Sequence, residues 1–521
     1  MIVTAIIHLK LKRKLKINRN IMIAKQLIEP KSIVVVGGSD DIHKPGGTVL
    51  RNLQDGNFKG SLYVVNPKMD EVQGITAYRD VKDLPEVDCA ILAIAAKFCP
   101  STVEVLAKQK NTKAFIILSA GFHEENEEGA KLERQIVETI NSVGGSLIGP
   151  NCIGVLTNHY SGVFTSPIPE LNPQGVDLIS GSGATALFIM DSGMQKGIKF
   201  NSMYSVGNSA QLGVEEILEY MDESFDPKTS SRVKLLYVES IEKPEKLLKH
   251  ASSLIRKGCR IAAVKSGGSA AGSRAASSHT GALASSDVAV EALFRKAGIV
   301  RCNGRDELMT VAGIFMHPEM KGRNMAVVTH AGGPAVMLTD ALSNGGMDVP
   351  HIEGEKAQEL LAKLFAGSSV GNPIDFLATG TAEQLGYILD ACDQDFDNID
   401  GMAVIFGSPG LFPVFDVYRV LDEKMKTSKK PIFPIFPSSK IVKDEIAEFV
   451  SKGRVYFPDE VLFGNALCKI YKTPAPQPEH FEMPDMDVKK IREVVDNAQN
   501  GYLSPDEIHV LLDAAGVARA K

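Results

Sequence analysis

The sequence lacks long apolar runs, because none reaches the roughly 18 residues of a membrane-spanning helix. It also lacks a large excess of either charge: 57 basic and 63 acidic residues give a formal net charge of −6. A nucleic-acid-binding surface needs a clustered basic face, which this balance does not indicate. We therefore expect a globular protein with neither nucleic acid nor a membrane among its partners.

Cysteine is scarce and scattered. The seven cysteines form no C-x-x-C pair, and this odd, dispersed set argues against both a disulfide framework and a zinc site. Such usage is typical of a reducing compartment, so we expect a cytoplasmic protein without a metal site of its own.

The first twenty residues do not resemble a secretory signal. A short apolar stretch at Met1–Ile7 precedes six basic residues, whereas a secretory signal has the opposite order. We expect residues 1–20 to be a disordered extension, or the product of an upstream start codon chosen in error, with an amphipathic transit peptide as the alternative.

Strands of branched apolar residues alternate with helical patterns, and the alternation restarts twice. The blocks open with the strands Ser32–Val36, Val176–Ile179 and Met325–Val328. Each opening strand runs into a loop of small residues and then a helix, the order that builds a doubly wound sheet. The sequence therefore predicts an α/β protein of three serial doubly wound units, with ligands at the loops that follow strands.

The first of these loops, Gly37-Gly38, favours phosphate binding by backbone N–H groups, although tight turns without a ligand also use such pairs. A dinucleotide site would need G-x-G-x-x-G and an acidic residue after the second strand. The second strand ends instead in Asn66-Pro67-Lys68, which disfavours the alternative of an NAD(P)-dependent oxidoreductase. Lys68 suits a ligand with additional phosphate such as coenzyme A, and an ordinary exposed lysine explains it as well.

The segment Lys265–Ala284 consists almost wholly of Gly, Ala and Ser and contains one histidine, His279. We expect a loop whose backbone approaches another group closely. A neutral imidazole can accept a phosphoryl group when anion-binding donors and an orienting carboxylate are near. Ser180–Ala184, at a predicted helix start, is a candidate anion site, and Glu239 is a candidate carboxylate. A hydrogen-bonding surface histidine is the alternative.

Motifs along most of the chain resemble the NDP-forming acyl-CoA synthetases, in particular the ADP-forming acetyl-CoA synthetase α-subunit type, relatives of succinyl-CoA synthetase. The matching segments are Val35–Ser39, Val65–Lys68, Ser119–Glu124, Gly149–Cys152, Val206–Asn208, Tyr237–Ser240, Ser277–Gly281 and Thr329–Gly333.

The resemblance implies a Rossmann-like CoA-binding domain at residues 21–155, a phosphohistidine domain at 156–300 and a third domain at 301–472, the last two flavodoxin-like. It implies the reaction of acyl-CoA, ADP and phosphate to carboxylic acid, CoA and ATP, reversible, through an acyl phosphate and phosphorylated His279. Glu239 would steady the phosphohistidine. Phosphate would be bound by Ser182, Gly183 and Asn208, and CoA by Gly37, Gly38, Ser39, Pro67, Lys68, Gly121 and Asn151.

The family's ATP-grasp module, which binds ADP or ATP with Mg²⁺, is the missing part of the pattern. Residues 473–521 are expected to be a linker and the opening helix of that module. We expect a chain cut from a longer fused protein, with a partner β-subunit as the alternative, and an oligomer. The non-enzyme alternative is a CoA-sensing regulatory module, which the presence of His279 disfavours. No motif identifies the acyl group.

Overall fold

The structure, a computed structural model, describes residues 23–56, 58–280, 285–408, 413–478, 486–498 and 502–517, with the backbone alone at 276–280. The extension expected at residues 1–20 lies outside the described residues. Residues Met22–Pro476 form one compact unit, and the described residues after Gln477 belong to another. Among the described residues, no helix has the length and apolarity needed to cross a bilayer.

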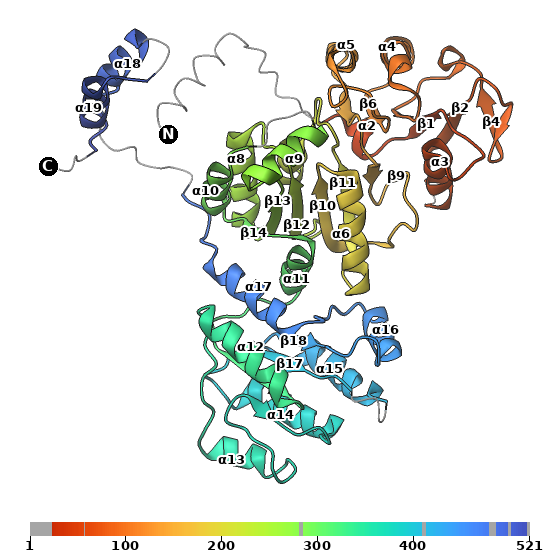
Figure 1. Ribbon diagram of the computed structural model, residues 1–521. Coiled ribbons are helices and arrows are strands. Elements are labelled where there is room, and N and C mark those ends of the chain that lie inside the picture. Colours follow the sequence, from red (N-terminus) through yellow and green to blue (C-terminus); the bar gives the residue numbers. More distant parts are fainter. Residues whose placement is uncertain are drawn as a thin grey trace. The chain divides into compact units, whose positions relative to one another are not determined.

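The first sheet of the large unit has the strand order β3-β4-β2-β1-β5-β6-β7. Figure 1 shows this sheet in red and orange. The central strand β1 (Ser32–Val36) pairs in parallel with β2 and with β5. The strand order therefore reverses between β1 and β5, the place where doubly wound sheets bind ligands. Its elements are α2 (Lys25–Ile28), α3 (Pro45–Asp55), β2 (Ser61–Val65), β3 (Glu71–Val72), β4 (Ile75–Tyr78), β5 (Cys89–Leu92), α4 (Cys99–Gln109), β6 (Ala114–Ile117), α5 (Glu127–Ser142) and β7 (Ser146–Ile148), with short 3₁₀ turns at Val81–Asp83 and Ala96–Phe98.

The second sheet has the order β14-β13-β12-β10-β11-β8-β9. Its five parallel strands follow the flavodoxin order, and β8 adds an antiparallel edge to β11. Strands β8 and β14 are the first and last strands of this sheet along the chain. The domain boundaries expected at residues 155 and 300 fall inside these two strands. Its elements are β8 (Gly154–Leu156), β9 (Ser161–Val163), β10 (Leu171–Ser180), α6 (Gly183–Gln195), β11 (Phe200–Ser205), α7 (Val214–Glu223), β12 (Val233–Val238), α8 (Pro244–Arg256), β13 (Arg260–Lys265), α9 (Ala270–Thr280), α10 (Asp287–Ala297), β14 (Val300–Cys302) and α11 (Arg305–Phe315).

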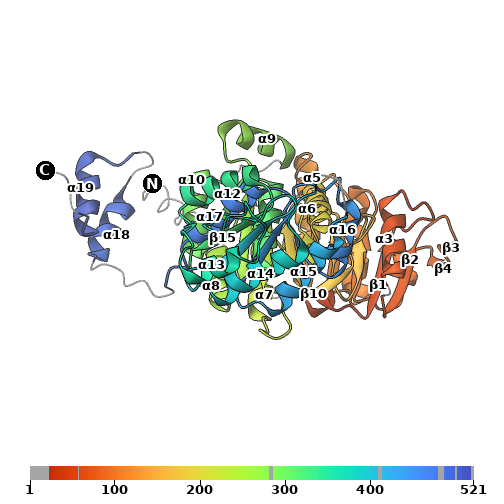
Figure 2. The ribbon, with the colours of Figure 1, turned by 90° about the horizontal axis from the view of Figure 1, so that it is seen from below.

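Helix α9 occupies most of the segment for which a loop was expected, so that prediction was wrong for residues 270–280. The segment is rich in alanine, the strongest helix former. The hydroxyl of Ser269 caps the helix by accepting a hydrogen bond from the Gly272 N–H at 3.0 Å. Figure 2 shows α9 (green) on the outside of the unit. Residues 281–284 lie outside the described residues.

A buried ion pair links two neighbouring strands of the second sheet. The Lys234 ammonium of β12 donates to the Asp177 carboxylate of β10 and to the Ser231 carbonyl oxygen at 2.7 Å. The two side chains are 2% and 4% exposed. Asp177 also accepts from the Asn201 amide at 2.7 Å and the Ser202 hydroxyl at 2.6 Å. Every polar atom of this carboxylate is therefore matched by a donor, as burial of a charge requires.

The third sheet has the order β16-β15-β17-β18, and a parallel bridge between Ile435 and Phe457 extends it. This is again the flavodoxin order, so the predicted α/β fold of serial doubly wound units is confirmed. Its elements are β15 (Met325–Thr329), α12 (Gly332–Asn344), α13 (Glu355–Leu361), β16 (Ile374–Asp375), α14 (Ala382–Gln394), β17 (Gly401–Ile405), α15 (Phe415–Thr427), β18 (Ile432–Ile435), α16 (Lys443–Ser451) and α17 (Glu460–Lys472).

One hydrophobic core joins the second and third sheets. It contains Met309 of α11, Leu338 of α12 and Phe463 of α17, together with strand residues of both sheets. Helix α17 (blue) lies beside α11 and α12, where Figure 1 shows it between the two sheets.

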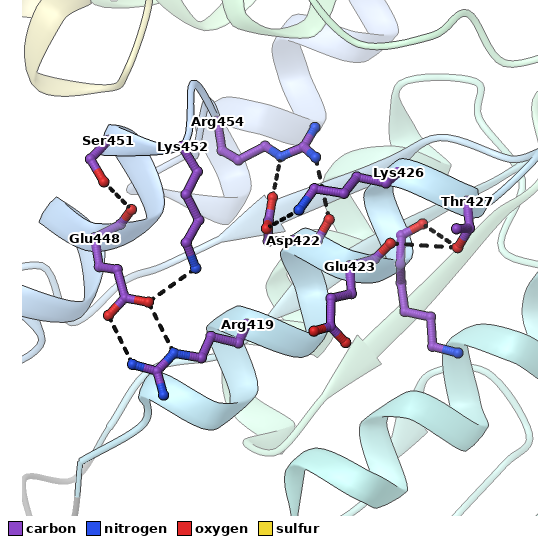
Figure 3. A network of polar contacts seen from close by, with 10 residues as sticks. Arg419, Asp422, Glu423, Lys426, Thr427, Glu448, Ser451, Lys452 and Arg454 are labelled. Carbon is purple, nitrogen blue, oxygen red and sulfur yellow. Dashed lines mark hydrogen bonds and ion pairs between the residues drawn. The ribbon is translucent and has the colours of Figure 1, made fainter.

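Ion pairs fasten the outer helices of the third sheet (Figure 3). Arg419 of α15 donates to both carboxylate oxygens of Glu448 of α16 at 3.0 and 3.2 Å. Arg454 donates to Asp422 of α15 at 2.7 Å. The Arg419–Glu448 pair therefore links α15 to α16, and the Arg454–Asp422 pair links α15 to the segment that follows α16.

The described residues after Gln477 form two helices, α18 (Val488–Asn497) and α19 (Pro505–Ala514). Helix α19 begins with a capping box in which the Ser504 hydroxyl and the Glu507 carboxylate each satisfy the other's backbone N–H. The helical pattern expected near this position is therefore present.

Candidate active site

A cavity of about 660 Å³ lies where loops of the first and second sheets meet. The first sheet contributes residues that follow β6 and β7, and the second contributes residues that follow β10, β11 and β12. All are carboxyl ends of strands, where open α/β sheets bind ligands. Five residues predicted from the sequence line this one cavity: Asn151, Ser182, Gly183, Asn208 and Glu239.

The start of α6 provides an anion site in the cavity wall. The Ser182 hydroxyl caps this helix by accepting a hydrogen bond from the Thr185 N–H at 3.4 Å. The N–H groups of Gly183 and Ala184 belong to the first turn, where a helix offers no internal acceptor. Together with the positive end of the helix dipole, they make this wall suited to phosphate.

Glu239 lies directly after β12, in a loop that is fixed from two sides. The Glu215 carboxylate, 5% exposed in α7, accepts from the N–H groups of Glu242 and Lys243 at 2.9 and 3.0 Å. The Ser285 hydroxyl accepts from the Ile241 N–H at 3.0 Å. The loop therefore holds the Glu239 backbone in a defined place beside the α6 start.

His279 lies in the last turn of α9. Its side chain is outside the described residues, so its predicted role as phosphoryl acceptor stays a prediction.

Asn208 has a different arrangement from the one expected for a phosphate ligand. Its Nδ2 donates to Glu124 Oε2 and, at 3.2 Å, to Glu133 Oε2. Its backbone N–H donates to the Pro150 carbonyl oxygen at 2.9 Å. With both amide hydrogens directed at carboxylates, Asn208 bridges the first and second sheets and has no side-chain donor left for phosphate.

Glu124 anchors the loop that follows β6. Its Oε1 accepts from the backbone N–H groups of Gly121 at 2.7 Å and Phe122 at 3.2 Å. Burial would raise the pKa of Glu124, but the hydrogen bonds from Asn208 and from the Gly121 N–H outweigh it and lower the pKa. Glu124 is therefore ionised at neutral pH and keeps this loop attached to Asn208.

Two residues of the cavity were missed from the sequence, His123 and Glu133. Nδ1 of His123 lies 2.8 Å from each Glu133 carboxylate oxygen. His123 belongs to the matching segment Ser119–Glu124, but no spacing rule connects it to Glu133, ten residues further along in α5.

The other predicted CoA ligands lie along the carboxyl edge of the first sheet and do not line this cavity: Gly37, Gly38, Ser39, Pro67, Lys68 and Gly121. The Asn66 amide donates to the Gly38 carbonyl oxygen at 2.9 Å, which joins the loops after β1 and β2. Gly37 has φ +89°, and a Cβ on Gly46 would lie 2.1 Å from the Gly37 oxygen. These glycines therefore let α3 start close to the strand, and Lys68 is exposed beside them.

His123, Glu124 and Glu133 place three potential metal-ligand atoms within 4.8 Å of one another. The hydrogen bonds that these groups make with one another, with Asn208 and with the backbone account for their arrangement. We therefore assign no metal to them.

A methyl group on Gly183 should disturb the anion site. A Cβ there would lie 2.5 Å from Ile153 Cγ2, whereas a Cβ on Gly181 would meet nothing closer than the Tyr237 oxygen at 3.7 Å. We expect Gly183→Ala to weaken phosphate binding by about tenfold or more, because a displaced helix start misaligns its N–H groups. Titration calorimetry with inorganic phosphate measures this effect.

Gly181→Ala is the matched control and should bind phosphate as the unaltered chain does. Adding Ile153→Ala to Gly183→Ala removes the clashing methyl group and should restore part of the affinity. Equal losses in the two glycine variants would contradict the steric explanation.

Known protein families match the parts of the chain that form the first and second sheets. The family described as CoA binding domain matches residues 31–158, and the succinyl-CoA ligase like flavodoxin domain matches residues 173–315. The chain is 35% identical over 381 residues to acetate–CoA ligase [ADP-forming] I of Archaeoglobus fulgidus, covering 72% of this chain and 54% of that protein. It is 32% identical over 431 residues to the α subunit of acetate–CoA ligase [ADP-forming] II of Pyrococcus furiosus, covering 82% of this chain and 92% of that subunit.

A solved structure is similar as well. Acetyl-coenzyme A synthetase 1 of Ca. Korarchaeum cryptofilum, in complex with phosphate and ADP, superposes with a TM-score of 0.77 at 26% identity, covering 86% of this chain and 96% of that one. The chain spans about half the length of the Archaeoglobus relative and nearly all of the Pyrococcus subunit. It therefore belongs to the family of ADP-forming acetate–CoA ligases, the NDP-forming acyl-CoA synthetases that its motifs resemble.

Proposed function

We propose that this chain converts an acyl-CoA and phosphate into CoA and an acyl phosphate, and then takes the phosphoryl group onto His279. One observation carries the proposal: the α6 start, Glu239 and the loops after β6 and β7 of the CoA-binding sheet line a single cavity. A phosphate and a thioester can meet there.

The chain's own residues divide the work between the two walls of the cavity. The N–H groups at the α6 start, with the Ser182 hydroxyl beside them, hold phosphate. Phosphate attacks the thioester carbonyl carbon, and His279 then attacks the phosphorus of the acyl phosphate and releases the carboxylate. Glu239 orients the imidazole and stabilises the positive charge that develops on it.

CoA is held along the carboxyl edge of the first sheet. The glycines at 37 and 38 carry no side chain that would keep the pyrophosphate away from the backbone, while the Gly37 N–H itself donates to the Val65 carbonyl oxygen. Lys68 supplies positive charge for the phosphates. Ser39, Pro67, Gly121 and Asn151 complete this edge, with Asn151 at the point where the edge enters the cavity.

Phosphoryl transfer between His279 and ADP requires a further domain that binds the nucleotide. An ATP-grasp domain, in the same polypeptide or in a β subunit, would bind ADP or ATP with Mg²⁺ and accept the phosphoryl group from His279. The Pyrococcus relative is named an α subunit, which supports a partner subunit and an oligomer. All seven cysteines are unpaired and buried, which supports a cytoplasmic location.

A partial reaction tests the proposal without the nucleotide module. Acetyl-CoA and ³²P-phosphate, added together, should label the protein with an acid-labile, base-stable bond and release CoA thiol in proportion. Arsenate in place of phosphate should give continuous thiol release, because acyl arsenates hydrolyse. Absence of label together with absence of arsenate-dependent thiol release would refute the proposal.

A further inference from the structure

An imidazole–carboxylate pair lies on the first-sheet side of the cavity. His123, between β6 and α5, has Nδ1 2.8 Å from both Glu133 oxygens. The side chains are 29% and 12% exposed, and both line the cavity. A carboxylate at Nδ1 fixes the orientation and tautomer of an imidazole. Nε2 is then the ring atom that exchanges a proton with a ligand.

Glu133 is held in turn by the second sheet. Asn208 donates to Glu133 at 3.2 Å and also to Glu124, and the Asn151 amide donates to the Asn208 oxygen at 3.3 Å. The imidazole is therefore oriented by a chain of contacts that crosses the cavity. A side chain fixed in this way suits proton transfer, which depends on alignment.

The position of the pair matches one step of the proposed reaction. His123 and Asn151 belong to the first-sheet edge proposed for CoA, whereas the α6 start on the second sheet is the proposed phosphate site. A thioester whose CoA part lies along the first-sheet edge and whose carbonyl reaches the α6 start would bring its sulfur to the side of the cavity that His123 lines. Sulfur is the atom that needs a proton when the thioester is cleaved.

We infer that His123 carries the proton in the thioester step and that Glu133 is its positioning residue; this inference rests on the proposed function. An oxygen of hydrogen phosphate forms a bond to the carbonyl carbon, the C–S bond breaks, and sulfur leaves with the electron pair. The His123 imidazolium gives its Nε2 proton to that sulfur. The proton that the attacking hydrogen phosphate loses then restores the imidazolium, so the products are acyl phosphate and CoA thiol.

Acetyl phosphate separates this step from the next one, because it can label His279 without breaking a C–S bond. His123→Gln should slow arsenate-dependent thiol release from acetyl-CoA by about 100-fold or more, while labelling by ³²P-acetyl phosphate stays within about twofold of wild type. Glu133→Gln should slow thiol release by about tenfold and leave labelling unchanged.

His159→Gln is the matched control, since His159 also pairs with a carboxylate, Glu29 at 3.3 Å, but lies outside the cavity. It should leave both rates unchanged. Equal losses in both assays for His123→Gln would mean a structural role, and no loss in either would remove the role altogether; both results overturn the inference. Failure of the wild-type protein to be labelled by acetyl phosphate would instead count against the proposed role of His279.

Discussion

Replacing His279 with alanine is expected to abolish labelling of the chain by acetyl-CoA and ³²P-phosphate. The reason is chemical: alanine offers no nucleophile, so the acyl phosphate has no acceptor on the protein. Arsenate-dependent thiol release should stay within about threefold of wild type. The reason is that cleavage of the thioester comes before phosphoryl transfer to His279 in the proposed reaction, and loss of the imidazole affects only that transfer. The two rates are measured by scintillation counting after gel filtration and by a thiol reagent.

His351→Ala is a suitable control, since His351 is 70% exposed in the third-sheet region and has no role in the proposal. It should be labelled as wild type is. Label that survives in His279→Ala, with the same acid lability, would place the phosphoryl group on another residue. Loss of thiol release as well would show that the substitution disturbs the cavity rather than one step.

Replacing Lys234 with methionine is expected to lower the free energy of unfolding by about 3–5 kcal/mol, because the Asp177 carboxylate is left buried without its cation. The two remaining donors, Asn201 and Ser202, do not neutralise the charge. Urea unfolding followed by circular dichroism measures the change.

The double variant Asp177→Asn with Lys234→Met removes the uncompensated charge, keeps acceptors for Asn201 and Ser202, and should recover most of the loss. Lys108→Met supplies the comparison, because Lys108 and Glu104 form an exposed pair, 53% and 51% exposed. It should cost less than about 1 kcal/mol. A loss as small for Lys234→Met would mean that water reaches Asp177.

The sequence predicted the sheets better than it predicted the contacts between them. Ser32–Val36 was recognisable because it is a short run rich in β-branched residues that ends in a glycine pair, which favours a strand buried on both faces. The antiparallel pair β8 and β9 was missed: its strands are three residues each and have no alternating pattern. The loop prediction for residues 270–280 was wrong because it rested on the small size of the residues, whereas the alanines among them favour a helix.

In the candidate site, too, residues with a local sequence signal could be predicted and contacts between the two sheets could not. Ser182, Gly183 and Glu239 could be predicted, because each stands at the carboxyl end of a recognisable strand, and such ends meet at one edge. The bridging role of Asn208 and the pairing of His123 with Glu133 could not, because they depend on how closely two sheets approach. That distance is set by packing and not by any local pattern.

The core shared by the second and third sheets bears on how such chains can be rearranged during evolution. Met309, Leu338 and Phe463 are buried in a core to which strand residues of both sheets contribute. A gene fusion or exchange that moved one sheet without the other would expose this apolar face to water, a cost of several kcal/mol before any new partner covers it. The two flavodoxin-like parts should therefore be inherited together, whereas the first sheet, which has a core of its own, is the part that can be reordered.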